Sequence, residues 1–115
     1  MKNQILIDTI KALEDKSNQS GKAIWKALAE ELDAPKRRRV AVNLSRIDRH
    51  TAEDEVVAVP GKVLAAGSLS KPVKIAAFSF SEGAVEKIKL AKGEYMSLDE
   101  LLASGVEPSQ IRIMK

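Results

Sequence analysis

The apolar pattern of the chain changes at Val40, and this change constrains the fold more than any other feature of the sequence. Before that residue, apolar side chains recur at the spacing of one helical face, whereas after it they come in short runs separated by Gly, Pro and Ser. Strands and helices that alternate at short range are typical of an α/β layer. We therefore predict an α/β protein with an N-terminal helical hairpin at residues 1–35 and an α/β core at residues 36–115, together forming one globular unit. The short connections leave the direction of strand pairing open.

Two helices are predicted before residue 35. The first is expected in QILIDTIKALED, where Leu6, Ile10 and Leu13 fall on one face at i, i+4 and i+7 spacing. Turn residues follow in KSNQSG, and Ser20 is expected to be the N-cap of the second helix. The pair should form an antiparallel hairpin that packs on the rest of the protein.

The second helix is expected in GKAIWKALAEELD, where Ile24, Leu28 and Leu32 stack on one face and Pro35 follows the end. Trp25 lies beside this face. Aromatic residues make up only 3% of the chain, so Val, Ile, Leu and Ala must supply most of the core. We expect the indole of Trp25 to join that core, with stacking on a nucleic-acid base as the alternative.

Short apolar runs predict the strands of the core. A strand is expected in VAVNL, ending near Leu44, with a helical turn in SRIDRH after it. Two separate strands are expected in EVVAVP and KVLAA, because Pro60-Gly61 between them is a turn pair. The clearest strand is VKIAAFSF. A helix is expected in SEGAVEKIKLAKG, with Gly93 as its C-cap, and a short strand in EYMS. A further helix is expected in SLDELLASG, where Ser97 and Glu100 form a capping box at its start. The last element is a strand in QIRIMK.

The positive charge of the chain is concentrated in residues 36–50. The net charge is only +3, and residues 1–35 carry five Lys against six acidic residues. Residues 51–115 carry eight Lys or Arg against nine acidic residues, whereas residues 36–50 carry six against Asp48 alone. The central segment therefore holds the whole positive excess, and a local field of one sign attracts polyanions.

Three roles are open to the basic run KRRR at residues 36–39: a solvated linker, a targeting signal and a surface that meets phosphates. The run leaves a helix that ends at Pro35 and enters a strand at Val40, so both of its ends are held. Arg outnumbers Lys five to one in residues 36–50, and the planar guanidinium binds phosphate bidentately. A nuclear localisation signal requires neither this preference nor a following strand. The sequence therefore favours phosphate contact, and the polar residues that continue the surface are Asn43, Ser45, Arg46 and Arg49.

Patterns typical of catalysis and metal binding are missing from the sequence. One His and no Cys exclude the usual zinc sites, which need three or four such ligands. His50 would need a partner to act as a base, and the acidic residues at 53–55 are better explained as a solvated turn. A Gly-Lys pair occurs in VPGKV, but the first Gly and the trailing Ser or Thr of a P-loop are missing. We predict no enzyme, no catalytic residue, no metal site, no cofactor and no small-molecule substrate.

The sequence also lacks the usual signals for a membrane or for secretion. No apolar run approaches the roughly 20 residues that a membrane-spanning helix needs. Asp8 and Glu14 interrupt any secretory signal in the N-terminal MKNQILIDTIKALEDK. We therefore expect a cytoplasmic protein with no membrane partner.

Several motifs of the chain occur in the order and at the spacing of one known family. These are VNLSRI, VPGKVL, GSL, and FS ahead of a helix with Ala and Lys-Ile. With RRRVAVNLSRIDRH, they resemble the archaeal large-subunit ribosomal protein eighteen-e and, more distantly, the C-terminal half of bacterial ribosomal protein fifteen. The resemblance covers nearly the whole chain. It implies an irregular succession of ββα units, a structural role in the large ribosomal subunit, and large-subunit ribosomal RNA and neighbouring ribosomal proteins as partners.

The resemblance further implies which residues face ribosomal RNA. Carried over position by position, they are Lys36, Arg37, Arg38, Arg39, Asn43, Ser45, Arg46, Arg49 and Lys62. For Asn43, a role in a turn or bulge is an equal alternative. The chain departs from the family pattern at Lys92 of AKGEY, where the related families often have a second Gly, so the local turn is open.

Two other functions remain as alternatives. In a DNA-binding protein the hairpin would act as a helix-turn-helix, but its second helix carries Glu30, Glu31 and Asp33, which make a poor face for the major groove. A small RNA-processing enzyme is the second alternative, and turnover by the purified protein would reveal it. The scarcity of aromatic residues argues against a sheet that stacks bases, so recognition of RNA shape and backbone is expected.

Overall fold

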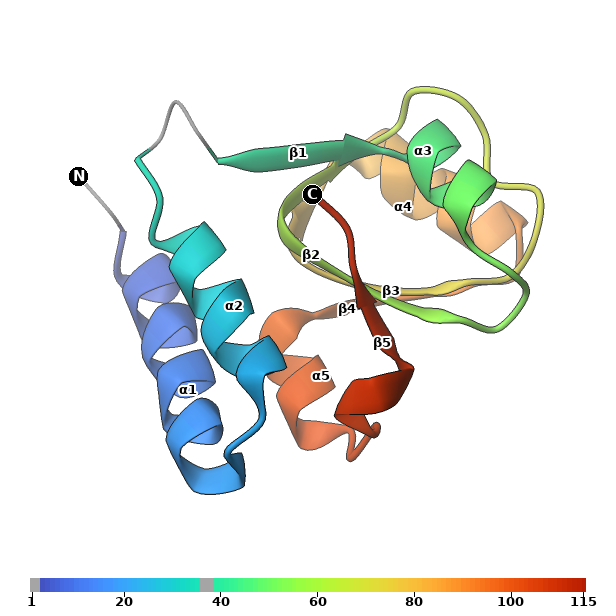
Figure 1. The fold of residues 1–115 in the computed structure, drawn as a ribbon. Coiled ribbons are helices and arrows are strands. Elements are labelled where there is room, and N and C mark those ends of the chain that lie inside the picture. Colours follow the sequence, from blue (N-terminus) through green and yellow to red (C-terminus); the bar gives the residue numbers. More distant parts are fainter. Residues whose placement is uncertain (1–2, 36–38) are drawn as a thin grey trace.

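The computed structural model describes residues 3–35 and 39–115, and it places a helical hairpin beside a twisted sheet (Figure 1). The hairpin consists of α1 (Gln4–Ser20) and α2 (Ala23–Leu32). The side chains of Leu6, Ile10 and Leu13 on α1 are buried, as their spacing predicts. The α/β class and the N-terminal helical region are confirmed.

The turn of the hairpin differs from the prediction. Ser20 is the last residue of α1 and not the N-cap of α2, because Gly21 takes a left-handed φ of 69° and its N–H donates to the carbonyl of Ser17. The hydroxyl of Ser20 accepts a hydrogen bond from the amide of Lys22, which is itself the N-cap of α2 and makes no side-chain capping bond. The prediction was wrong because the left-handed glycine, not the serine, fixes where the chain reverses.

In the part of the chain that the structure describes, five strands form one sheet, with the order β1-β2-β3-β4 and with β5 also paired to β2. They are β1 (Val40–Asn43), β2 (Val56–Leu64), β3 (Lys74–Phe80), β4 (Glu94–Ser97) and β5 (Ile111–Ile113). All four ladders are parallel, which settles the direction of pairing. Since β3 pairs with both ends of β2, β1 and β5 share the other edge of β2.

Parallel strands need connections that cross over a face of the sheet, and helices supply most of them. The connecting helices are α3 (Leu44–His50) after β1, α4 (Glu82–Leu90) after β3, and α5 (Leu98–Ala103) after β4, followed by a short 3-10 helix at Pro108–Gln110. The predicted capping box is present at the start of α5, where Ser97 and Glu100 bond reciprocally. The order β2-β3-α4 gives a ββα succession, while the other connections alternate strand and helix.

The sheet separates two apolar clusters, one on each face. On β2, Val56 and Ala58 join the cluster beneath α1, α2 and α5, whereas Val57 and Val59 join the cluster beneath α3 and α4. This alternation follows from the two-residue period of a strand, and a sheet covered on both faces accounts for the nearly continuous apolar sequence of β2.

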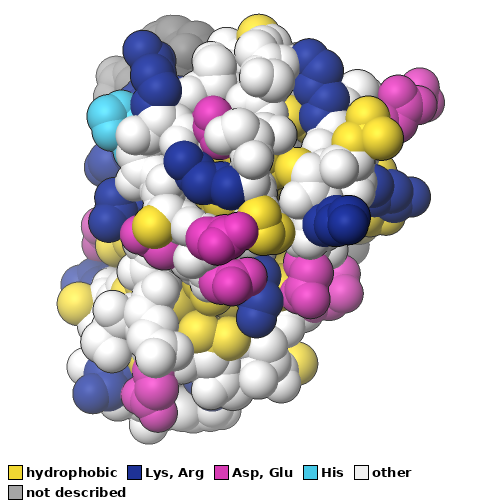
Figure 2. All heavy atoms as spheres, turned by 90° about the vertical axis from the view of Figure 1, so that its right-hand side faces the viewer, with side chains coloured by type: hydrophobic (Ala, Val, Ile, Leu, Met, Phe, Trp, Pro, Cys, Tyr) yellow, Lys and Arg dark blue, Asp and Glu magenta, His cyan; other side chains and the backbone are white. Residues whose placement is uncertain are grey.

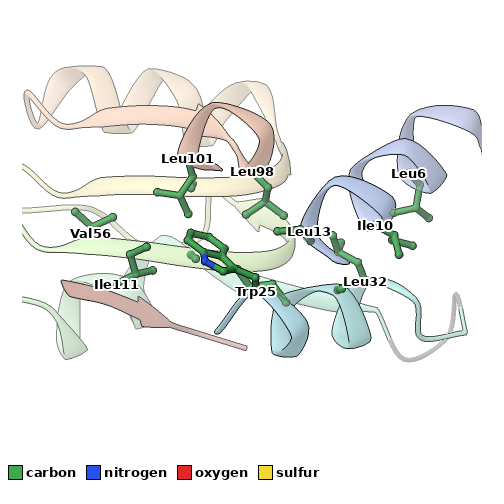
Figure 3. Close-up of a cluster of buried hydrophobic side chains, with 13 residues drawn as sticks. Leu6, Ile10, Leu13, Trp25, Leu32, Val56, Leu98, Leu101 and Ile111 are labelled. Atoms are coloured by element: carbon green, nitrogen blue, oxygen red, sulfur yellow. The ribbon is translucent and has the colours of Figure 1, made fainter. Parts of the chain in front are cut away.

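Trp25 belongs to the first of these clusters. Its indole is 2% exposed and lies over the sheet, beside the side chains of Leu98 and Leu101 on α5 (Figure 3). The prediction that Trp25 joins the core is therefore confirmed, and the buried ring is not available to stack on a base. The helical hairpin is held to the sheet through this residue.

The predicted turn at Pro60-Gly61 is wrong, because β2 runs unbroken through both residues. Proline lacks the N–H that a regular ladder needs and is therefore rare in a central strand. Here the register of β2 against β3 shifts between Val59 and Lys62, so that Pro60 lies at the irregularity. Gly61 pairs with Val40 of β1.

The end of α4 also differs from the prediction, because Gly93 is not the capping residue. Lys92 takes the left-handed conformation, with a φ of 62°, and the amide of Gly93 donates to the carbonyl of Ile88 over 3.0 Å. The amide of Lys92 donates to the carbonyl of Lys89. These bonds satisfy the carbonyls of the last helical turn, with a lysine in the place that glycine usually takes.

Replacing Lys92 with glycine should therefore stabilise the protein. We expect Lys92→Gly to raise the free energy of unfolding by about 0.5 to 1 kcal/mol, because the relief of left-handed strain exceeds the greater chain entropy of glycine. Urea unfolding measures this change. Glu94→Gly is the control, since it puts glycine into β4 and should destabilise; a destabilised Lys92→Gly variant would contradict the account of the turn.

Candidate nucleic-acid interface

Of the basic run at residues 36–39, the structure describes only the last residue. Lys36, Arg37 and Arg38 lie outside the described residues, and Arg39 comes directly before β1 with its side chain half-buried. The expected surface can therefore be followed in the structure from Arg39 onward.

Strand β1 brings Lys62 into line with the basic segment. Ala41 of β1 is paired in register with Lys62 of β2, and both residues are exposed. The next residue of β1, Val42, is buried and anchors the strand in the core. The structure thus places Lys62 directly beside the strand that follows Arg39, although 22 residues lie between Arg39 and Lys62 in the sequence.

Helix α3 presents two further cations to solvent. Leu44 and Ile47 are fully buried, whereas Arg46 and Arg49 are exposed. Their i, i+3 spacing puts the two Arg side chains on one face. Asn43 stands at the N-cap position but makes no side-chain capping bond, so its amide is not used to cap α3.

The face of the molecule that carries α3 and α4 shows this distribution of charge (Figure 2). Lys and Arg side chains predominate in the upper part of the view, where α3 lies, and acidic side chains gather across the middle. Among the described residues, no carboxylate pairs with Arg46 or Arg49. The positive potential of α3 is therefore not cancelled locally.

The loop between β2 and β3 is fastened against α3. The amide of Ser45 donates to the carbonyl of Ala66, and the ammonium of Lys87 on α4 donates to the carbonyls of Ala65 and Gly67. Gly67 has a φ of +83°, and a Cβ on it would lie 2.3 Å from the Cβ of Ser45. The half-buried Ser45 is thus a packing contact for this loop as well as a candidate RNA contact.

A second fastening lies at the other end of the loop. The carboxylate of Asp48 accepts hydrogen bonds of 2.9 Å from both the amide and the hydroxyl of Ser70, and the ammonium of Lys71 lies 3.7 Å from it. The backbone bond from Ser70 is the largest cause that lowers the pKa of Asp48. The one acidic residue of segment 36–50 therefore holds the loop and stays ionised at neutral pH.

Sequence reasoning missed this loop. GSL and the Lys-Ile pair that contains Lys87 entered only as motifs of a resemblance, and no contact between them was predicted. The hydrogen bonds to the loop come from the Lys87 side chain, which is 20 residues away from Gly67 in the sequence, so no local sequence pattern predicts them.

We expect Lys87→Met to loosen the loop without unfolding the protein. Methionine keeps the length and apolar stem of lysine but leaves the two carbonyls without their donor, which should cost about 1 to 2 kcal/mol. Amide hydrogen exchange should accelerate at residues 65–70. Lys11→Met on the exposed face of α1 is the matched control. Equal amide exchange rates at residues 65–70 in the two variants would show that the hydrogen bonds from Lys87 do not hold the loop.

The described residues show neither a metal site nor a membrane span. Across residues 3–35 and 39–115, no three His, Cys, Asp or Glu side chains come together in a way that could hold a metal ion. Within the same ranges, no helix has the length and apolarity to cross a membrane.

Comparison with known proteins identifies the family. Residues 7–96 match the model of the family described as ribosomal proteins 50S-L15, 50S-L18e and 60S-L27A. The large ribosomal subunit protein eL18 of Methanothermobacter thermautotrophicus is 45% identical over 113 residues, which cover 98% of this chain and 93% of that protein. The eL18 protein of Archaeoglobus fulgidus is 43% identical over 112 residues, which cover 97% of this chain and 96% of that protein. Since these matches extend over nearly the whole sequence, the chain belongs to the ribosomal protein family of 50S-L15, 50S-L18e and 60S-L27A.

Proposed function

We propose that this protein is a structural constituent of the large ribosomal subunit and binds large-subunit ribosomal RNA in the cytoplasm. The contact surface proposed for RNA consists of Lys36, Arg37, Arg38, Arg39, Asn43, Ser45, Arg46, Arg49 and Lys62. Neighbouring ribosomal proteins are its other proposed partners. The family is structural and non-enzymatic, so the protein is not an enzyme.

One observation carries the proposal for RNA. Helix α3 is anchored through Leu44 and Ile47, and it holds Arg46 and Arg49 in solvent with no carboxylate of the described residues paired to them. Exposed guanidinium groups on an anchored element are suited to phosphate oxygens, which they bind bidentately. Exposed Lys62 adds a further cation beside β1.

The alternative of DNA binding through the hairpin is less well supported. The major-groove reader would have to be α2, yet this helix buries Trp25, Leu28 and Leu32 against the sheet. On its exposed face, Lys26 lies 4.0 Å from Glu30 and is partly neutralised. A recognition helix needs a free face of basic and polar side chains.

We expect the purified protein to prefer folded large-subunit ribosomal RNA over duplex DNA at the same salt concentration. The proposed surface reads backbone and shape, which differ between A-form RNA and B-form DNA. Competition binding measures the preference. Arg46→Gln with Arg49→Gln should weaken RNA binding more than Lys11→Gln with Lys26→Gln, which removes the same charge from the hairpin.

Two results would contradict this proposal. One is equal affinity for the RNA and the duplex DNA. The other is failure of a tagged protein to sediment with large subunits at low magnesium, where the subunits separate.

A further inference from the structure

A small pocket lies where the helical hairpin meets the sheet. It has a volume of about 230 Å³, and its apolar lining includes Leu6 of α1, Leu32 of α2 and Phe78 of β3. Pro60 closes it from β2, and Arg39 and Lys62 supply its charge. The pocket thus joins the proposed RNA surface to the apolar core.

Arg39, which lines this pocket, carries an unused donor. Its Nε atom is buried and has no hydrogen-bond partner among the described residues. Buried polar groups are nearly always bonded, so an unpaired one calls for an explanation. A shift of the Arg39 side chain toward the pocket would let an acceptor of a bound molecule satisfy it.

The backbone next to Arg39 is held close to β2. A Cβ on Gly61 would lie only 2.0 Å from the carbonyl oxygen of Val40, so β1 approaches β2 as closely as glycine allows. The backbone of Val40, which follows Arg39, is therefore held against β2 at the edge of the pocket.

We propose that this pocket takes one unpaired base of the bound RNA. The proposal rests on the proposed function and adds a specific contact to it. A base has flat apolar faces and an edge of acceptors, which match the wall of Phe78 and Pro60 and the Nε donor of Arg39. The volume is below the about 300 to 1,000 Å³ of pockets for drug-sized ligands, so the pocket suits one base rather than a larger group. The exposed ammonium of Lys62 lies at the same site to meet the adjoining phosphate.

Two variants separate this contact from general RNA binding. Ser79→Met puts a larger side chain into the pocket wall and leaves the charge unchanged, since Ser79 lines the pocket from β3. Arg39→Lys also keeps the charge but removes the Nε–H. The matched control is Arg112→Lys on β5, the same exchange at a residue that pairs with Glu55 outside the pocket.

The probe is a fully paired RNA hairpin compared with four hairpins that each carry one unpaired A, G, C or U. The wild-type protein should bind at least one of the four about 5- to 100-fold more tightly than the paired hairpin, the range expected for stacking of one base. Both pocket variants should lose this preference. Ser79→Met should also keep the affinity for the paired hairpin, and Arg112→Lys should keep both the preference and the affinity. On binding, the NMR resonance of the Arg39 Nε–H should shift.

The proposal is overturned if the wild-type protein binds all five hairpins equally, or if the preference survives in both pocket variants. Circular dichroism melting shows that each variant is folded, and Arg39→Lys remains informative if Ser79→Met is not. If the proposed function itself is wrong, the result is different: neither the hairpins nor large-subunit ribosomal RNA would then bind the protein more tightly than duplex DNA does.

Discussion

Gly61→Ala should destabilise the protein by about 3 kcal/mol, at the upper end of the usual cost of overpacking. The added Cβ would lie 2.0 Å from the carbonyl oxygen of Val40 and 2.8 Å from its carbonyl carbon. Both are backbone atoms, so no side-chain rotation relieves the clash and β1 must move away from β2. Because β1 leads into α3, RNA affinity should fall together with stability. Urea unfolding and RNA binding at a temperature where the variant is folded measure the two effects.

Gly21→Ala is the control for this prediction. Gly21 has a left-handed φ of +69°, but a Cβ there would have no atom within 4 Å. It should cost about 1 to 2 kcal/mol through backbone strain alone and leave RNA affinity unchanged. If Gly61→Ala were no more damaging than Gly21→Ala and bound RNA normally, the close approach of β1 to β2 would not position the interface.

Local sequence patterns correctly predicted those helices and strands that are determined by residues close together in the sequence. The capping box of Ser97 and Glu100 and the strand at Lys74–Phe80 were found because neighbouring residues determine them. Pro60-Gly61 was misread, because its place in β2 depends on the register against β3 and on the contact with Val40. The parallel pairing of all strands likewise depends on crossovers that a sequence pattern does not specify.

The candidate site shows the same division. Charge and residue type pointed to Arg46 and Arg49, and the family resemblance added Lys62. The structure shows all three exposed on or beside the elements next to β1. Sequence reasoning treated Arg39 like the other cations of the run, but its half-buried side chain lines a pocket. Burial of an arginine beside two leucines of the hairpin depends on tertiary packing, which charge patterning does not reveal.

The basic run should contribute to RNA binding through its charge. Changing Lys36, Arg37 and Arg38 to Gln removes three charges and spares Arg39, whose burial would complicate the result. If each cation neutralises one phosphate, the slope of log K against log salt should become shallower by about 2 to 3 units, at roughly 0.7 to 0.9 per phosphate. Stability should change by no more than about 0.5 kcal/mol per site, since each substitution exchanges a charged side chain for a polar one and removes no apolar residue. Binding to large-subunit ribosomal RNA from 50 to roughly 200 mM salt measures the slope.

The matched control changes Lys11, Lys22 and Lys26 to Gln, which removes the same charge from exposed positions of the hairpin. Its slope should change by less than about one unit, because counterion release requires charges at the RNA and not merely a lower net charge. Loss of the basic run should weaken random RNA as much as ribosomal RNA, whereas Arg46→Ala or Asn43→Ala should weaken ribosomal RNA more, if those residues meet its particular shape. A triple variant that binds with an unchanged slope and still enters large subunits would show that residues 36–38 are a solvated linker, leaving α3 and Lys62 to hold the RNA.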